Sequence, residues 1–133
     1  MSTFHLTIST PDGLLFDGEV VSLRLRMIDG DLGLLANHEN YVSAVGAGEA
    51  VLVTEDGETK RAACIGGMLT MLDNKAKLLA TTFEWAEDIN LERAQKAKTK
   101  AEQRIAEAKE NSKELLLASA KLQRALVRIK VKS

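Results

Sequence analysis

The sequence predicts a β plus α protein, in which an N-terminal antiparallel β-sandwich is followed by a C-terminal α-helical hairpin. All nine glycines and the single proline lie at or before position 67 of the 133 residues. Hydrophobic residues alternate with period two in the first part, and from about residue 89 they recur every three or four positions. Because glycine and proline mark turns, a turn-rich sheet should precede an uninterrupted helical segment.

The first strands follow from this alternation. Apolar residues take every second position in 4–9 and again in 21–27, which is typical of half-buried strands. Between them, Thr10-Pro11-Asp12-Gly13 has proline where a turn needs φ near −65° and glycine where it needs freedom. We therefore expect the chain to reverse direction after the first strand.

Two hairpins follow along the chain. Asp56-Gly57 lies between the β-rich runs 51–54 and 59–65, and Asp73-Asn74 lies between 68–72 and 77–82. Several short strands separated by turn signals predict an antiparallel sandwich or barrel. Gly66-Gly67 within a strand pattern predicts a bulge or a close backbone approach.

The helical segment has two apolar stripes, which predict two helices of about 20 residues each. The first stripe comprises Ala94, Ala97, Ala101, Ile105 and Ala108, and the second comprises Leu115, Ser119, Leu122, Leu126 and Ile129. Asn90 is a predicted N-cap of the first helix, and Asn111 with Glu114 has the form of a capping box for the second. The predicted domains are residues 1–86 and 87–133.

Charge divides along the same boundary. Residues 1–86 carry six Lys/Arg and 12 Asp/Glu, a net charge of −6, whereas residues 87–133 carry 12 Lys/Arg and seven Asp/Glu, a net charge of +5. A basic tail indicates an acidic partner or a tail that folds back on its own domain. Nucleic acid is disfavoured because the tail has no aromatic residue to stack on bases.

Composition excludes several other classes. With 45% hydrophobic and 28% charged residues the chain should be globular, and its longest uncharged stretch, residues 62–72, is too short to span a bilayer. A soluble chain without a targeting segment is expected. The single cysteine, Cys64, cannot form an internal disulfide and supplies no thiolate metal site.

The sequence indicates no catalytic site or metal site of its own. It contains no HExxH, GxSxG, GxxxxGK or CxxC pattern. A nucleophilic pair of Cys64 with a histidine is conceivable, but a cysteine in an apolar strand usually serves packing. Residues 29–33 begin like a calcium loop, yet the later ligand positions are apolar, so a tight turn between strands is favoured.

The order of several motifs resembles a known family. The motifs are Leu6-x-Ile8-x-Thr10-Pro11-x-Gly13-x-x-Phe16-x-Gly18-Glu19-Val20, then Gly30-Asp31-Leu32-Gly33-Leu34-Leu35-Ala36-Asn37-His38, then Gly66-Gly67, then the alanine-rich charged hairpin. Together they resemble the epsilon subunit of bacterial F-type ATP synthase over essentially the whole chain. That family joins a β-sandwich to a helical hairpin, in agreement with the periodicity.

The resemblance implies a structural and regulatory role in the central stalk. The expected partners are the gamma subunit, the membrane rotor ring of c subunits and the catalytic alpha/beta hexamer, and the expected location is the cytoplasmic face of the bacterial cell membrane, as a peripheral protein. Asp31 and His38 match the loop that approaches the ring in this family. A solvated turn residue and a strand-end side chain are the plainer alternatives for these two.

For the tail, the resemblance implies inhibition of ATP hydrolysis through basic residues that meet acidic loops of the hexamer. The candidate residues are Arg93, Arg104, Lys121, Arg124 and Arg128. A solvent-facing helix surface is the alternative for each of them.

Some relatives bind ATP on the folded hairpin through Ile-Asp-x-x-Arg-Ala and further arginines. The corresponding positions here are Ile89, Asn90, Arg93 and Ala94, with Arg104 downstream. Asparagine replaces the aspartate of that motif. The resemblance thus implies no required cofactor and leaves ATP as a candidate regulatory ligand. A free-standing interaction module with a coiled-coil arm is the alternative function.

Overall fold

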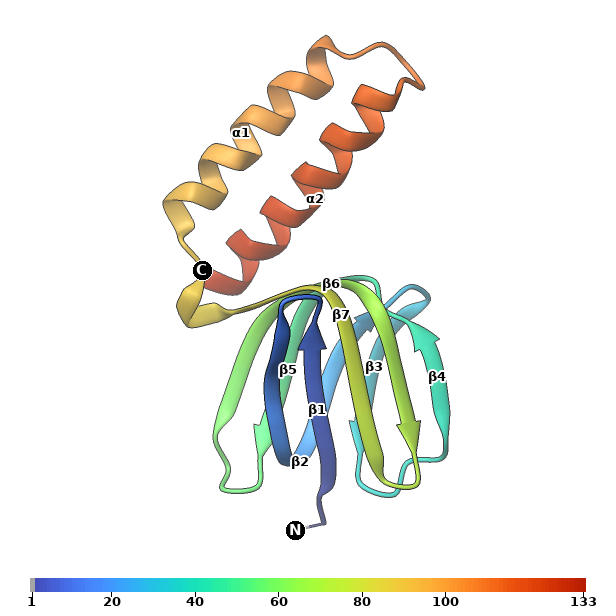
Figure 1. Ribbon diagram of the computed structural model, residues 1–133. Helices are drawn as coiled ribbons and strands as arrows, with labels where there is room; N and C mark the ends of the chain where they lie inside the picture. The colour runs from blue at the N-terminus through green and yellow to red at the C-terminus, as the bar shows by residue number, and fades with distance from the viewer. Residues whose placement is uncertain (1) are drawn as a thin grey trace. The chain divides into compact units, whose positions relative to one another are not determined.

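The structure, a computed structural model, describes residues 2–133 and divides into two compact units, one ending at Trp85 and the other spanning Ala86–Ser133 (Figure 1). The first unit contains only strands and the second contains helices, so the predicted fold class is confirmed. The strands are β1 (Phe4–Thr10), β2 (Gly13–Met27), β3 (Gly30–Leu35), β4 (Tyr41–Ala44), β5 (Ala47–Thr54), β6 (Thr59–Leu72) and β7 (Lys75–Trp85).

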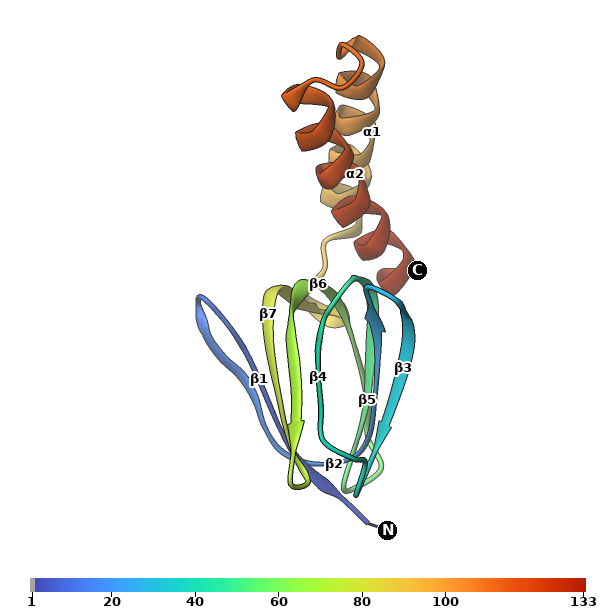
Figure 2. The same cartoon turned by 90° about the vertical axis from the view of Figure 1, so that its right-hand side faces the viewer.

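The strands pair in the order β1-β7-β6-β5-β2-β3, with β4 on β6 and a further pairing of β1 with β2. The two longest strands, β2 and β6, belong to both layers of the sandwich, and these layers face each other in Figure 2. The first part of β2 pairs with β1 and the rest with β3 and β5, whereas β6 pairs first with β5 and then with β4. All pairs are antiparallel except β1 with β7, which is parallel.

Gly66 and Gly67 lie where β6 changes partner. Their φ angles are 73° and 118°, and a Cβ on Gly67 would collide with the carbonyl oxygen of Leu79 on the neighbouring strand. The Gly66 N–H donates to the Gly46 carbonyl at 2.9 Å, which joins this point to the corner before β5. The predicted close backbone approach is therefore confirmed, and its cause is the step of β6 from one layer to the other.

The core lies between the two layers, on the inward positions of each strand. Its buried side chains all belong to the segment from Phe4 to Phe83, so the sandwich has a hydrophobic core of its own. Cys64 belongs to this core, and burial raises the pKa of its thiol to about 12. The thiol is thus protonated at neutral pH, in keeping with a packing role.

His5 on β1 lies between two carboxylates of the paired strand β2. Its Nδ1 is 2.8 Å from Glu19, and its Nε2 contacts Asp17. The hydrogen bond to Glu19, and to a lesser extent that to Asp17, raises the pKa of His5 above its ordinary 6.5. The same bond to His5 lowers the pKa of Glu19 below its ordinary 4.5.

We expect this cluster to stabilise the fold mainly between about pH 4.5 and pH 6.5. The contribution of His5 is fully present below its unfolded pKa and is lost as pH rises through its raised folded pKa. That of Glu19 is present above its unfolded pKa and is lost as pH falls through its lowered folded pKa. All three groups are partly exposed, so the effect should be a modest Tm shift.

Thermal unfolding of the variant His5→Gln across pH tests this prediction. The Tm deficit relative to the unaltered chain should be largest near pH 5–6, because this range lies between the ordinary pKa values of Glu19 and His5. The deficit should shrink toward pH 9. His38→Gln is the matched control, because the Nδ1 of His38 bonds a backbone carbonyl instead. A deficit for His5→Gln that is constant with pH would count against the cluster.

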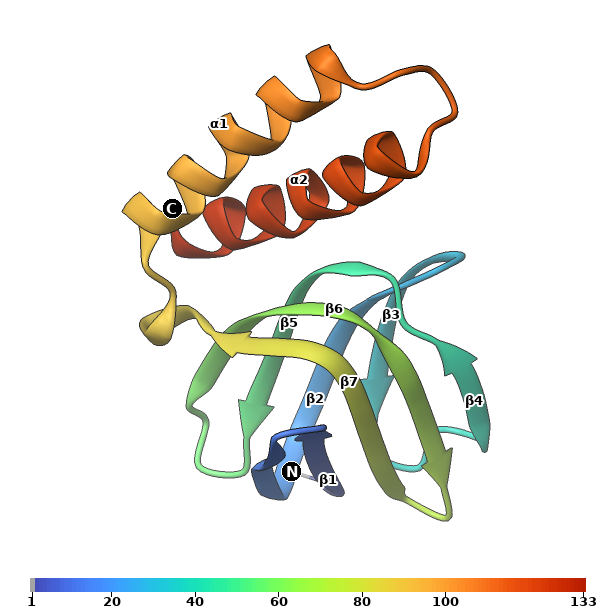
Figure 3. The ribbon, with the colours of Figure 1, turned by 45° about the horizontal axis from the view of Figure 1, so that its top comes forward.

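The second unit is a helical hairpin, as predicted. A short 3₁₀ turn (Ala86–Asp88) leads into α1 (Leu91–Glu107) and α2 (Lys113–Lys132), which run side by side in Figures 1 and 3. Asn90 caps α1 by accepting from the Arg93 N–H at 3.0 Å. Among the described residues, neither helix is long and apolar enough to cross a membrane.

The predicted cap of the second helix is wrong by one residue. Ser112 is the N-cap of α2, and its hydroxyl accepts from the Leu115 N–H at 3.1 Å. Asn111 instead has a φ of 58°, a left-handed conformation that asparagine tolerates better than most residues. Asn111 therefore serves the turn between the helices, and the serine that follows serves the cap.

The predicted apolar stripes are only partly right. The fully buried helical residues are Ala94, Ala101, Ala118, Ala125 and Val131. The alanines are seven apart on each helix, the spacing of an antiparallel coiled coil, and their small size lets two helices approach closely. Ala97, Ser119 and Leu126 are exposed, because a narrow alanine contact leaves flanking positions at its margin.

Candidate docking surfaces

Asp31 is the second residue of β3, close to the β2–β3 turn, and lies opposite Arg26 in the strand register. Its carboxylate accepts a hydrogen bond from the Arg26 guanidinium at 3.3 Å, and its side chain is 85% exposed. Ile28 in the same turn is 70% exposed. A projecting turn that combines an apolar tip with a weakly paired carboxylate is well suited to contact another chain.

His38 lies beyond the other end of β3. Its Nδ1 is 2.8 Å from the Glu39 carbonyl oxygen, and its ring packs edge-on against Tyr41 at 6.0 Å between centroids. At about 3.4 Å per strand residue, Asp31 and Leu35 are already roughly 14 Å apart. The structure therefore places Asp31 and His38 near opposite ends of β3, and not on the single loop that the family resemblance implied.

An exposed apolar row crosses the outer face of the layer that contains β1, β4 and β7, and no sequence pattern predicted it. Strand register makes Leu79 the neighbour of Met68 and of Ser9, and makes Ser9 the neighbour of Leu14. We call four exposed apolar side chains of this face the docking row, namely Leu14, Val42, Met68 and Leu79; Leu72, further along β6, is a fifth exposed apolar side chain on the same face. Large apolar side chains that gather on an exposed sheet face mark an interaction surface.

The five basic tail residues predicted from the sequence lie on one side of the hairpin. Arg93 and Arg104 are close to three full turns apart, and thus share a face of α1. Lys121, Arg124 and Arg128 share a face of α2 by their spacing. The two faces meet in an open hollow of about 370 Å³ that both Arg104 and Lys121 line.

The hollow is not purely basic. Glu107 and Glu114 also line it, together with the half-exposed Leu117. Mixed charge around an open hollow is better suited to a protein surface that carries both charges than to a bare polyanion.

The residues that match the ATP motif do not converge on one site. Ile89 and Ala94 are buried, and the side-chain oxygen of Asn90 is engaged as the cap of α1. Arg93 and Arg104 face the same side but lie about 16 Å apart along the helix axis. The structure thus assigns Asn90 a capping role, and nucleotide binding at this segment stays a prediction.

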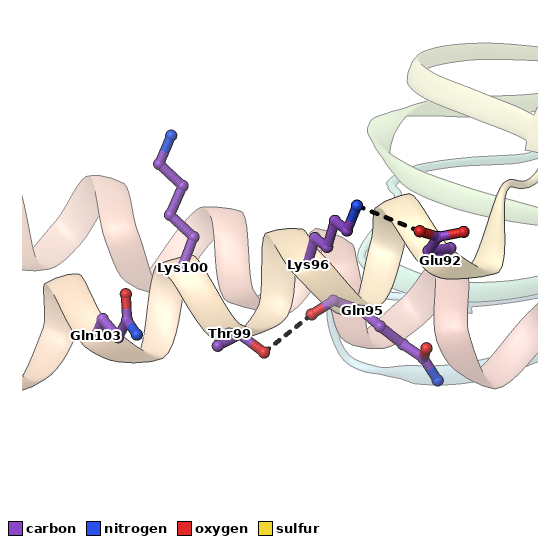
Figure 4. A pocket seen from close by; sticks show the side chains of 6 residues that line it. All are labelled: Glu92, Gln95, Lys96, Thr99, Lys100 and Gln103. Carbon is purple, nitrogen blue, oxygen red and sulfur yellow. Dashed lines mark hydrogen bonds and ion pairs between the residues drawn. The ribbon is translucent and has the colours of Figure 1, made fainter.

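A second face of α1 is polar throughout. Figure 4 shows its six residues, with Lys96 Nζ 3.2 Å from Glu92 and the Thr99 hydroxyl donating to the Gln95 carbonyl at 3.2 Å. Such pairs one turn apart are typical of a solvated helix face.

Two family models match the chain. The β-sandwich domain of the ATP synthase delta/epsilon chain matches residues 3–86, and its long α-helix domain matches residues 87–133. The ATP synthase epsilon chain of Caldicellulosiruptor bescii is 38% identical over 131 residues, covering 98% of this chain and 94% of its own. That of Lacticaseibacillus casei is 36% identical over 136 residues, covering 99% and 95%.

Among solved structures, a chain of the Euglena gracilis mitochondrial ATP synthase OSCP/F1/c-ring complex superimposes with a TM-score of 0.85. It is 20% identical, and the match covers 98% of this chain and 81% of that one. A chain of the Tetrahymena thermophila mitochondrial ATP synthase central stalk and c-ring gives a TM-score of 0.64 at 11% identity. These two likenesses support the fold.

Proposed function

This chain belongs to the ATP synthase delta/epsilon chain family, and from that membership we propose that it is a central-stalk subunit of a bacterial F-type ATP synthase. In this role it couples ion flow to ATP synthesis and restrains ATP hydrolysis, without catalysis of its own. The observation that carries the proposal is the docking row, which gives the sandwich an apolar face for a permanent partner. As part of the complex, the chain lies at the cytoplasmic face of the cell membrane.

The gamma subunit is the proposed occupant of the docking row. Leu79 and Met68 are direct cross-strand neighbours, and Leu14 and Val42 extend the row on either side. Covering such side chains gains about 25 cal/mol for each Å² of apolar surface removed from water. His38 lies four residues before Val42, in the loop that leads into β4, so the proposed gamma contact extends into the loop after β3.

The membrane ring is the proposed partner of the β2–β3 turn. In the ion pair of Asp31 with Arg26, the Asp31 side chain is the more exposed of the two, and Ile28 offers an apolar contact beside it. This end of β3 is opposite to the His38 end, so we assign ring contact to Asp31 and gamma contact to His38. The alternative, a free-standing interaction module, is disfavoured because both units match the family.

We expect Asp31→Lys to lower coupled ATP synthesis in membranes by about twofold to tenfold, because a reversed charge at a contact sets like charges against each other. The fold should be unaffected, since an exposed ion pair contributes little to stability. Proton-driven or sodium-driven synthesis in reconstituted vesicles is the readout. Glu58→Lys, the same reversal in the β5–β6 turn, is the control. Unchanged synthesis by Asp31→Lys would remove this turn from the ring contact.

A further inference from the structure

One asparagine joins three separate segments at the His38 end of the sandwich. The Asn74 side-chain oxygen accepts from the Asn37 N–H at 2.7 Å, and its Nδ2 donates to the Thr3 carbonyl at 3.0 Å. Its backbone carbonyl accepts from the His5 N–H at 3.2 Å. Asn74 thereby ties the β6–β7 turn to the chain start and to the loop that follows β3.

The turn itself does not need this side chain. Asp73 and Asn74 have φ angles of 50° and 64°, as a two-residue hairpin turn of type I′ requires, and glycine is well suited to the second of these positions. The side-chain amide of Asn74 therefore makes contacts that the turn itself does not require and that a glycine in the same backbone conformation could not make. Its two side-chain bonds both go to backbone groups outside the turn.

The loop held by Asn74 leads into the docking row. Residues 36–40 include Asn37, itself left-handed with a φ of 64°, and His38, and β4 with the exposed Val42 follows directly. A second bond, from the Asp73 N–H to Asn40 Oδ1 at 3.1 Å, holds the far side of the same loop. A loop ordered before binding loses less conformational freedom when a partner docks.

We infer that Asn74 is a positioning residue for docking on the gamma subunit. It does so without contacting the partner, by holding loop 36–40 and with it the start of β4, which carries Val42 of the docking row. This inference rests on the proposed function, because it takes the docking row to be the gamma-binding face.

The test compares three variants of the full chain. Asn74→Gly keeps the turn but removes both side-chain bonds, and Asn74→Asp keeps the acceptor for Asn37 but loses the donor to Thr3. Asp73→Gly is the matched control, because it relaxes the neighbouring left-handed residue and leaves its backbone bond to Asn40 intact. Affinity for a purified assembly of alpha, beta and gamma subunits is measured, together with amide exchange in residues 36–40.

We expect Asn74→Gly to bind about fivefold to tenfold more weakly, with faster exchange in loop 36–40 and a Tm that falls by only a few degrees. Asn74→Asp should lie between it and the unaltered chain, and Asp73→Gly should bind as the unaltered chain does. If Asn74→Gly unfolds, Asn74→Asp alone decides by the same two readouts.

Unchanged affinity, or weaker affinity without faster exchange in the loop, would overturn the inference. Leu79→Glu separates this failure from failure of the proposed function. If Leu79→Glu weakens binding and Asn74→Gly does not, the docking row stands and only the positioning role falls. If neither weakens binding, the docking row itself is wrong.

Discussion

A chain that ends at Glu87 should raise ATP hydrolysis by the assembled complex by about threefold to tenfold, the change that a docked state favoured by roughly 1 kcal/mol predicts. The deletion removes α1 and α2 and thus all five basic residues that lie on one side of the hairpin. The sandwich should survive, since its core ends at Phe83. Hydrolysis by complexes assembled with the full and the shortened chain is the measurement.

A charge-reversal pair shows whether the basic side causes the inhibition. Lys121→Glu with Arg124→Glu alters the basic side of α2, whereas Lys98→Glu with Lys130→Glu makes the same charge change at positions whose helical spacing turns them away from that side. We expect the first pair to reproduce most of the rise and the second to leave hydrolysis near the unaltered value. Equal effects of both pairs would indicate a response to net charge, and no rise with the shortened chain would exclude inhibition by the hairpin.

The strands and the hairpin were predictable because they depend on local signals. The alternation in residues 4–9, the Pro11-to-Gly13 turn and Asp56-Gly57 each act through neighbouring residues, and the structure has strands and turns at these places. The parallel pairing of β1 with β7 was not predictable, since it joins segments about 70 residues apart. Alternation shows which face of a strand is buried but not which strand lies beside it.

The same limit explains what was missed at the surfaces. Leu14, Met68 and Leu79 become neighbours only through strand register, so no motif in the sequence predicts this row. In the second helix, leucines were expected at the contact, but Ala118 and Ala125 take it, and Leu126 is 45% exposed. The family resemblance placed Asp31 and His38 on one loop, whereas most of β3 separates them.

Leu79→Glu should weaken binding to the gamma subunit by about tenfold to 100-fold, because it buries a carboxylate at the centre of an apolar contact. Leu79 is 59% exposed and Met68, its cross-strand neighbour, is 43% exposed, so the change should cost the isolated fold little. Met68→Glu should act in the same direction. Thr59→Glu is the control, because Thr59 is an exposed strand residue of β6 in the part that pairs with β5.

Titration of the full chain into a purified assembly of alpha, beta and gamma subunits tests the central claim most directly. The account predicts saturable binding of one chain to one gamma subunit, weakened by Leu79→Glu and unaltered by Thr59→Glu. Absence of binding by the unaltered chain, or equal affinity of Leu79→Glu and the unaltered chain, would contradict docking through this face.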